Sequence, residues 1–117
     1  ARPMITSDVV SEVVKAVKRN PAVTVGRPVT DTIKSCAKGQ TVDSTVARDR
    51  LWAVQTPQAF QLKVLKDAYK SLGKTEVTDD CQAVEIAGGQ VKIVENLRPN
   101  FKVTTVEDLQ LVSALVK

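Results

Sequence analysis

The sequence has 117 residues, of which 43% are hydrophobic and 26% are charged, values typical of one folded domain and not of a disordered chain. Seventeen basic residues against thirteen acidic ones leave a net charge of +4, a mild excess that suits an anionic ligand. Histidine is absent, which excludes histidine metal ligands and histidine-based triads within these residues. No apolar run is long enough to cross a bilayer, and aromatic residues, at 3%, are too few for a base-stacking platform. We therefore expect neither a membrane nor a nucleic acid as partner.

The first third of the chain predicts a helix, a strand and a hairpin. Five valines at helical spacing predict a helix over residues 6–19, with Thr6 or Ser7 as its N-cap. An alternating pattern then predicts a strand over 22–29. Residues 30–36 and 40–46 predict two short polar strands joined by a turn, a hairpin with too few apolar side chains to be stable alone. This hairpin needs outside support, such as a second subunit.

The middle of the chain predicts a strand and an amphipathic helix. Residues 51–55 predict a buried strand, with Trp52 more suited to the core than to ligand binding, and Thr56-Pro57-Gln58 is expected to end it. Apolar residues then recur at helical spacing over 62–72, and Gly73 ends that helix.

The last third predicts two further helices around one or two strands. Thr78 is expected to cap a helix that closes at Gly88-Gly89, which makes Asp79 and Asp80 first-turn acids that favour the helix dipole. Residues 90–94 predict a strand, and 101–103 a short one. Thr105 to Asp108 fits the capping-box pattern before a final helix.

Alternating helices and strands predict an α/β fold in layers. About three core strands are fewer than the ~5–6 of a typical sheet, so we expect this segment to be part of a longer polypeptide. Cys36 and Cys81 lie 45 positions apart without a CxxC pattern, which favours two reduced thiols.

Four stretches carry a more specific signal. They are Ala1-Arg2-Pro3, then Pro28-Val29-Thr30-Asp31-Thr32-Ile33-Lys34, then Arg48 with Leu51 to Phe60 (LWAVQTPQAF), and lastly Thr78-Asp79-Asp80 with Asn100 to Leu109 (NFKVTTVEDL). In this order they resemble the C-terminal half of the 2-C-methyl-D-erythritol 4-phosphate cytidylyltransferase family, and the resemblance spans residues 1–117. Ribitol-5-phosphate cytidylyltransferases share several of these strings.

The resemblance implies the C-terminal portion of a Rossmann-like nucleotidyltransferase sheet, in a homodimer whose protruding β-arm is formed by residues 30–46. It implies a cytoplasmic enzyme of the non-mevalonate isoprenoid route that joins CTP to 2-C-methyl-D-erythritol 4-phosphate. The products are 4-diphosphocytidyl-2-C-methyl-D-erythritol and pyrophosphate. Such a transfer depends on positioning and electrostatic stabilisation, with Mg²⁺ bound mainly by substrate phosphates and by residues outside this segment.

The resemblance also assigns roles by position. Lys102 matches a lysine that contacts the phosphates near the reacting centre, and Arg48 matches an arginine that reaches across the dimer to the methylerythritol phosphate. The substrate-binding positions are Arg2, Thr32, Thr56 and Thr78. Simpler interpretations stay open for several of these, such as an ion pair of Arg48 with Asp43 or Asp49, or a purely capping role for Thr78.

Some family features are missing from these residues. The glycine-rich loop that binds the triphosphate and a His-Asp pair would both precede Ala1, while Val106 and Arg50 replace a frequent proline and a frequent small residue. Two functions therefore compete: one half of an active cytidylyltransferase, or a non-catalytic fragment or dimerisation module that keeps part of the substrate pocket. A third, a basic nucleic-acid binder, rests only on the net charge of +4 and on clusters such as Lys15, Lys18 and Arg19. The segment alone is expected to be inactive.

Overall fold

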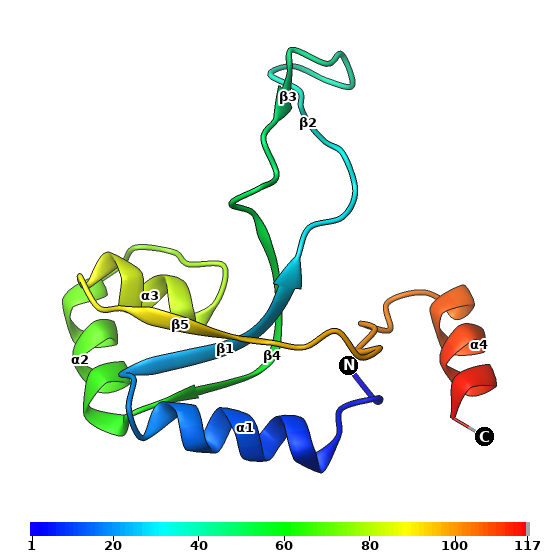
Figure 1. Ribbon diagram of the computed structural model, residues 1–117. Helices are drawn as coiled ribbons and strands as arrows, with labels where there is room; N and C mark the ends of the chain where they lie inside the picture. Colours follow the sequence, from blue (N-terminus) through cyan, green and yellow to red (C-terminus); the bar gives the residue numbers. More distant parts are fainter. Residues whose placement is uncertain (117) are drawn as a thin grey trace.

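The computed structural model describes residues 1–116 and contains both helices and strands (Figure 1). The elements are α1 (Ser7–Val17), β1 (Ala22–Pro28), β2 (Ile33–Ser35), β3 (Ser44–Val46), β4 (Trp52–Phe60), α2 (Leu62–Leu72), α3 (Asp80–Ile86), β5 (Val91–Glu95) and α4 (Val106–Leu115). This order is the one that the sequence predicts, and the α/β class is confirmed.

The central sheet has the strand order β4-β1-β5. Strand β1 pairs with β4 in the antiparallel sense and with β5 in the parallel sense, so it is covered on both edges. Strands β2 and β3 form a separate two-stranded sheet in which Ile33 pairs with Val46. The body is therefore a mixed sheet, and the hairpin is an addition to it.

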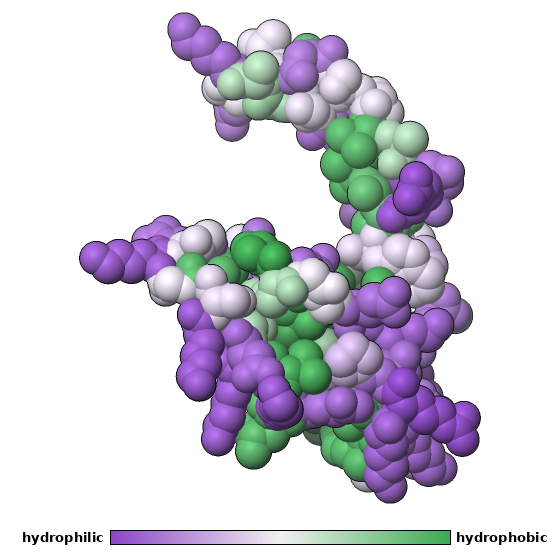
Figure 2. Space-filling view, turned by 90° about the vertical axis from the view of Figure 1, so that its left-hand side faces the viewer, coloured by the Kyte–Doolittle hydropathy of each residue, from purple (hydrophilic) through white to green (hydrophobic). Residues whose placement is uncertain are grey.

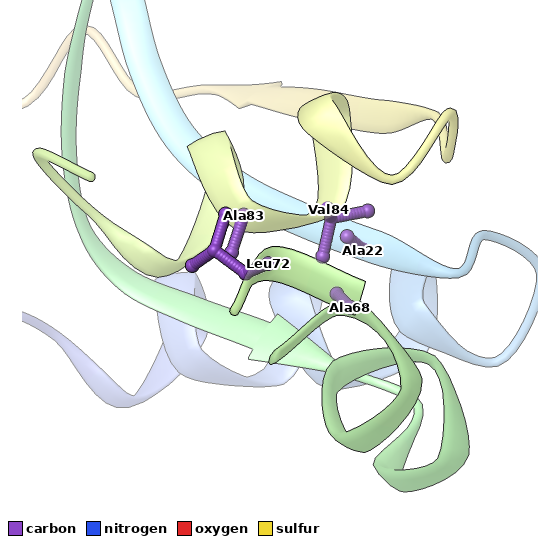
Figure 3. Packing of buried hydrophobic residues seen from close by; sticks show 5 residues of the cluster. All are labelled: Ala22, Ala68, Leu72, Ala83 and Val84. Carbon is purple, nitrogen blue, oxygen red and sulfur yellow. The ribbon is translucent and has the colours of Figure 1, made fainter. Parts of the chain in front are cut away.

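Helices cover both faces of this sheet. Helix α1 packs on one face, where Val9 and Val13 meet Val23 and Val25 of β1. On the opposite face α2 and α3 enclose a second cluster (Figure 3). Its buried members are Ala22, Ala68, Leu72, Ala83 and Val84. Successive side chains of β1 point to opposite faces, so one strand supplies both clusters and five of its residues are buried.

Two expectations about strands are wrong. Strand β4 does not end at Thr56-Pro57-Gln58: it runs to Phe60, and its pairing with β1 shifts register between Thr24 and Gly26. Pro57, which follows a cis peptide bond and has no N–H to donate, lies within this irregular stretch, where β4 does not pair in regular register with β1. The start of β4 is not buried either, since Trp52 is 38% exposed and Val54 is 41% exposed.

Two further local expectations need correction. Residues 101–103 form no strand, although Val103 donates one backbone hydrogen bond to the carbonyl of Ala1 at 2.8 Å. The valines of α1 do not all face the core, because Val10 and Val14 are exposed while Val9 and Val13 are buried. The packed stripe of this helix is therefore narrower than five valines suggest.

Two parts stand away from the body. The hairpin of β2 and β3 projects from the sheet, and α4 lies apart at the other side (Figure 1). The space-filling view shows the hairpin arching out, with apolar surface near its stem and on the body (Figure 2). The radius of gyration is 16.5 Å, against about 13 Å for a compact domain of this length. This molecule is thus a small packed body with two extensions.

Both cysteines are free thiols, as predicted, with Cys36 exposed on the hairpin and Cys81 buried in α3. Within residues 1–116 no helix is long and apolar enough to span a bilayer.

Candidate functional site

A polar cavity of about 510 Å³ opens where three distant segments meet. Strand β4 forms one wall, the start of α3 forms the second, and the third comes from the N-terminal residues together with the loop after β5. The lining residues are Ala1, Arg2, Val54, Gln55, Thr56, Gln58, Thr78, Asp79 and Lys102.

The β4 wall is shaped by the register shift described above. Because the strand carries extra residues there, Gln55, Thr56 and Gln58 all reach the cavity instead of alternating between the faces of the sheet. The hydroxyl of Thr24, buried in β1, donates to the carbonyl of Gln55 at 3.1 Å and so ties the irregular segment of β4 to β1.

The α3 wall begins with Asp79, which is the N-cap residue: its Oδ1 accepts from the backbone N–H of Gln82 at 2.8 Å. The prediction that Thr78 caps this helix is therefore wrong. Thr78 instead donates to Oε1 of Gln82 with its hydroxyl and its backbone N–H. The second oxygen of Asp79 accepts from Nε2 of Gln58 at 3.1 Å, so the carboxylate also ties α3 to β4.

The third wall depends on a loop anchored to β4. The side chain of Asn100, only 4% exposed, donates to Oε1 of Gln55 and to the carbonyl of Thr56, both at 3.0 Å. The carbonyl of Asn100 accepts from Nη1 of Arg2 at 2.7 Å. Lys102 follows two residues later and lines the cavity with Arg2.

The charges of the lining favour an anion. The lining contains two basic side chains, Arg2 and Lys102, and one acidic side chain, Asp79, whose oxygens accept two hydrogen bonds. Threonine hydroxyls and glutamine amides complete a surface suited to phosphate and hydroxyl groups.

The cavity lacks the ligands for a protein-held metal ion. In the described part of the chain no three Asp, Glu or Cys side chains come together as a metal-binding group. Asp79 is the one carboxylate of the lining and both of its oxygens accept hydrogen bonds, so a Mg²⁺ ion here would be held mainly by substrate phosphates and water.

The buried thiol next to this wall is not a nucleophile. Burial, and to a smaller extent the negative charge of Asp79, raises the pKa of Cys81 to about 12. A thiol in this state stays protonated at neutral pH, so covalent catalysis by Cys81 is not expected.

The structure brings together four of the six residues singled out from the sequence. Arg2, Thr56, Thr78 and Lys102 line the cavity. Arg48 and Thr32 lie outside it, beside the hairpin.

Arg48 is exposed, and its Nη1 donates to the carbonyl of Thr30 at 2.6 Å across the stem of the hairpin. Among the described residues it forms no ion pair with Asp43 or Asp49, so the pairing considered from the sequence is not made.

Sequence reasoning missed the cavity roles of Gln55, Gln58 and Asp79, as well as the anchoring role of Asn100. Both glutamines stand in the Gln-Thr-Pro-Gln string that carries part of the resemblance, so this string was the available signal. For Asp79 the sequence favours a first-turn acid over one of a pair of catalytic carboxylates with Asp80. Asn100 begins the Asn-Phe-Lys string that carries another part of the resemblance, but nothing in the local pattern indicates that its side chain would be buried against β4.

The cavity lies beside an α/β sheet and is lined by two cationic side chains, in a kind of position where open α/β sheets bind ligands. A family model described as 2-C-methyl-D-erythritol 4-phosphate cytidylyltransferase matches residues 1–117. The enzyme of that name from Alkaliphilus metalliredigens is 46% identical over 111 residues, covering 93% of this chain and 46% of the relative. A ribitol-5-phosphate cytidylyltransferase from Lactiplantibacillus plantarum is 39% identical over 119 residues, covering 99% of this chain and 51% of the relative.

Among solved structures, the 2-C-methyl-D-erythritol 4-phosphate cytidylyltransferase of Francisella tularensis superposes with a TM-score of 0.89 at 30% identity. It covers 99% of this chain and 56% of that one. The chain belongs to the 2-C-methyl-D-erythritol 4-phosphate cytidylyltransferase family. It spans about half the length of the curated relatives it matches.

Proposed function

We propose that this chain is part of an enzyme that joins CTP to 2-C-methyl-D-erythritol 4-phosphate. A phosphate oxygen of the sugar alcohol attacks the α-phosphorus of CTP in line, the bond to the β-phosphate breaks, and pyrophosphate leaves. The observation that carries the proposal is the family match along residues 1–117 combined with the cationic cavity that Arg2 and Lys102 line.

Lys102 and Arg2 would act on the phosphates. Negative charge builds up on the transferred and leaving oxygens, and fixed cations in a partly enclosed site stabilise it without rearranging at the moment of reaction. Arg2 is held ready by the carbonyl of Asn100. Thr56 and Thr78 supply hydroxyl groups to orient the substrate.

The remaining half of the polypeptide is proposed to supply the glycine-rich loop for the CTP triphosphate and to contribute the Mg²⁺ ligands. On that assignment these residues form the C-terminal half of one nucleotidyltransferase domain. We place the complete enzyme in the cytoplasm.

The hairpin is proposed to be a dimerisation arm. Its strands pair only with each other, and its large apolar side chain Val42 is 52% exposed. A two-stranded sheet of this kind is marginal in water, so a second subunit would stabilise it. Arg48 at its stem would then reach the sugar phosphate in the partner's cavity.

The complete polypeptide that contains this segment provides the test. Purified enzyme is mixed with CTP, Mg²⁺ and either 2-C-methyl-D-erythritol 4-phosphate or ribitol 5-phosphate, and pyrophosphate release and product mass are recorded. We expect the first substrate to be used with the higher kcat/KM. A preference for ribitol 5-phosphate would assign the chain to that activity instead, and no transfer with either would leave the dimerisation module as its function.

Arg48→Ala tests the arm in the same enzyme. We expect KM for the sugar phosphate to rise about tenfold, the equivalent of one lost charge-assisted hydrogen bond, with little change in KM for CTP. An effect confined to CTP would contradict this placement. Native mass spectrometry of a variant with residues 33–46 replaced by a short glycine linker is expected to show monomers where the unaltered enzyme shows dimers.

A further inference from the structure

We propose that Asn100 is a positioning residue that holds two walls of the cavity in register. It does not line the cavity and carries no charge, and no role was assigned to it from the sequence. The proposal deepens the function above and rests on it, because the groups that Asn100 positions are Arg2, Thr56 and Lys102.

The contacts of Asn100 join three segments that are distant in sequence. Its side-chain amide donates to Gln55 and Thr56 of β4, which are 45 and 44 residues away. Its backbone carbonyl accepts from Arg2, which is 98 residues away. The loop after β5 contains no regular element: the N–H of Asn96 attaches its start to the carbonyl of Gly26 at 2.9 Å, and the bonds of Asn100 attach the part that leads to Lys102. Removing the side chain would break the bonds to β4 that fix this part of the loop, and would thereby free the backbone carbonyl of Asn100 that binds Arg2.

The orientation of the amide is set by its partners. The carbonyl of Thr56 can only accept, so the nitrogen of Asn100 must face it. The side-chain oxygen is then left buried without a partner among the described residues. A buried unpaired acceptor lowers stability. Asn100 is therefore better explained by the two hydrogen bonds that its nitrogen donates than by a contribution to stability alone.

Lys102 depends on the same attachment. It lies two residues beyond Asn100, and the next residue, Val103, donates its backbone N–H to the carbonyl of Ala1 at 2.8 Å. The anchored asparagine thus fixes a short stretch of loop that carries the ammonium and also binds the N-terminal segment. Positioning of reacting groups is worth about 100-fold in rate for a displacement of roughly 1 Å.

Asn96 offers a matched control in the same loop. It is 6% exposed, nearly as buried as Asn100, and its side-chain oxygen accepts from the N–H of Arg98 at 3.1 Å. Replacing asparagine by aspartate keeps the side-chain oxygen that accepts, but it replaces the side-chain nitrogen, a donor, by a second oxygen, an acceptor. Asn96→Asp therefore places a carboxylate at a similarly buried position without removing a bond to β4, so it controls for the cost of burying a charge. In Asn100→Asp the new oxygen would face the side-chain oxygen of Gln55 and the carbonyl of Thr56.

The experiment compares Asn100→Asp, Asn100→Ala and Asn96→Asp in the complete enzyme. Steady-state kinetics with CTP and 2-C-methyl-D-erythritol 4-phosphate give kcat and both KM values, and hydrogen exchange of the Val103 amide reports the loop without any substrate. For both Asn100 variants we expect kcat to fall about 100-fold with KM for CTP within about threefold. We expect Val103 exchange to quicken about tenfold in those variants.

Asn96→Asp should lower the free energy of unfolding, because it buries a carboxylate, but should keep kcat and Val103 exchange within about twofold of the unaltered enzyme, because the bonds of Asn100 are intact. Normal kcat and normal Val103 exchange in Asn100→Asp would overturn the proposal, because the volume of the side chain, without the two donated bonds, would then be enough to hold the loop. Failure of both Asn100 variants to fold would also overturn it, because the residue would then serve the stability of the whole domain. An inactive unaltered enzyme would reject the proposed function, while the exchange comparison would still decide whether Asn100 holds the loop.

Discussion

The body and the extensions of this chain are built from similar local signals but differ in what surrounds them. In the body, β1 is buried on both faces between α1 and the pair α2 and α3. In the extensions, β2 and β3 pair only with each other, and Val112 is the buried residue of α4. The exposed apolar residues of α4 and its end are Val106, Leu109, Leu111, Leu115 and Val116.

The difference separates what forms an element from what stabilises it. Helix α4 has a complete capping box, whereas α1 has only the Thr6 side chain accepting from Val9 at 3.4 Å. Yet α1 contributes Val9 and Val13 to a hydrophobic cluster, whereas α4 buries Val112 and contributes to neither cluster. Capping determines where a helix begins, while burial of its apolar face supplies most of its stability.

The largest effect should come from a charge placed in the body. Val25 is 0% exposed and Val42 in the hairpin is 52% exposed. Val25→Asp is expected to cost more than ~4 kcal/mol in free energy of unfolding, because it buries an unpaired carboxylate, whereas Val42→Asp should change it by less than ~0.5 kcal/mol. Urea denaturation followed by circular dichroism measures both. Equal losses would show that the hairpin is part of the cooperative core.

The next effect concerns catalysis at the boundary between body and extension. Lys102→Ala in the complete enzyme is expected to lower kcat about 100- to 1000-fold, the cost of one lost electrostatic contact in a transition state, with a change in unfolding free energy below ~0.5 kcal/mol. Lys92→Ala is the control, since Lys92 is exposed on β5 and outside the cavity. Parallel losses of turnover and stability in Lys102→Ala would argue against a catalytic lysine.

Much of the fold was predictable because its signals are local. Helical spacing and caps gave α1, α2 and α4 nearly to their ends, with Gly73 and Thr105 at the expected boundaries. The errors come from tertiary structure. Thr56-Pro57 resembles a strand end, but the register shift against β1 lets β4 continue.

The candidate site was predictable only in part, for a related reason. The resemblance pointed to Arg2, Thr56, Thr78 and Lys102, and the fold places these four around one cavity. The bonds that hold them there join residues 21 to 98 positions apart, such as Gln58 to Asp79 and Arg2 to Asn100. No local pattern encodes those pairings.

Smaller effects should come from the two helix caps. Thr6→Ala and Thr105→Ala each remove an N-cap worth about 1 kcal/mol. The loss at Thr6 should lower the global unfolding free energy, because α1 packs on the core through Val9 and Val13. The loss at Thr105 should instead increase hydrogen exchange within α4 and leave the midpoint of global unfolding nearly unchanged. A matching drop in the midpoint for both variants would show that α4 unfolds together with the body.

The smallest effect should be the pH dependence of α4. Hydrogen bonds from the backbone N–H and the hydroxyl of Thr104, and then from the N–H of Thr105, hold the pKa of Asp108 below its usual value of 3.8. Because the folded state lowers this pKa, the stabilisation is complete above 3.8 and is lost as the pH falls through the folded value.

Helical NMR shifts of α4 should therefore hold from pH 6 down to about 4 and decline below that, while those of α1 change less over the same range. Asp108→Asn should show weakened α4 shifts already at pH 6, since a neutral amide accepts these bonds less strongly than a carboxylate. If the shifts of α4 fall with pH equally in Asp108→Asn and in the unaltered chain, another group must control the acid response, and the capping box would not be the feature that sets the start of this helix.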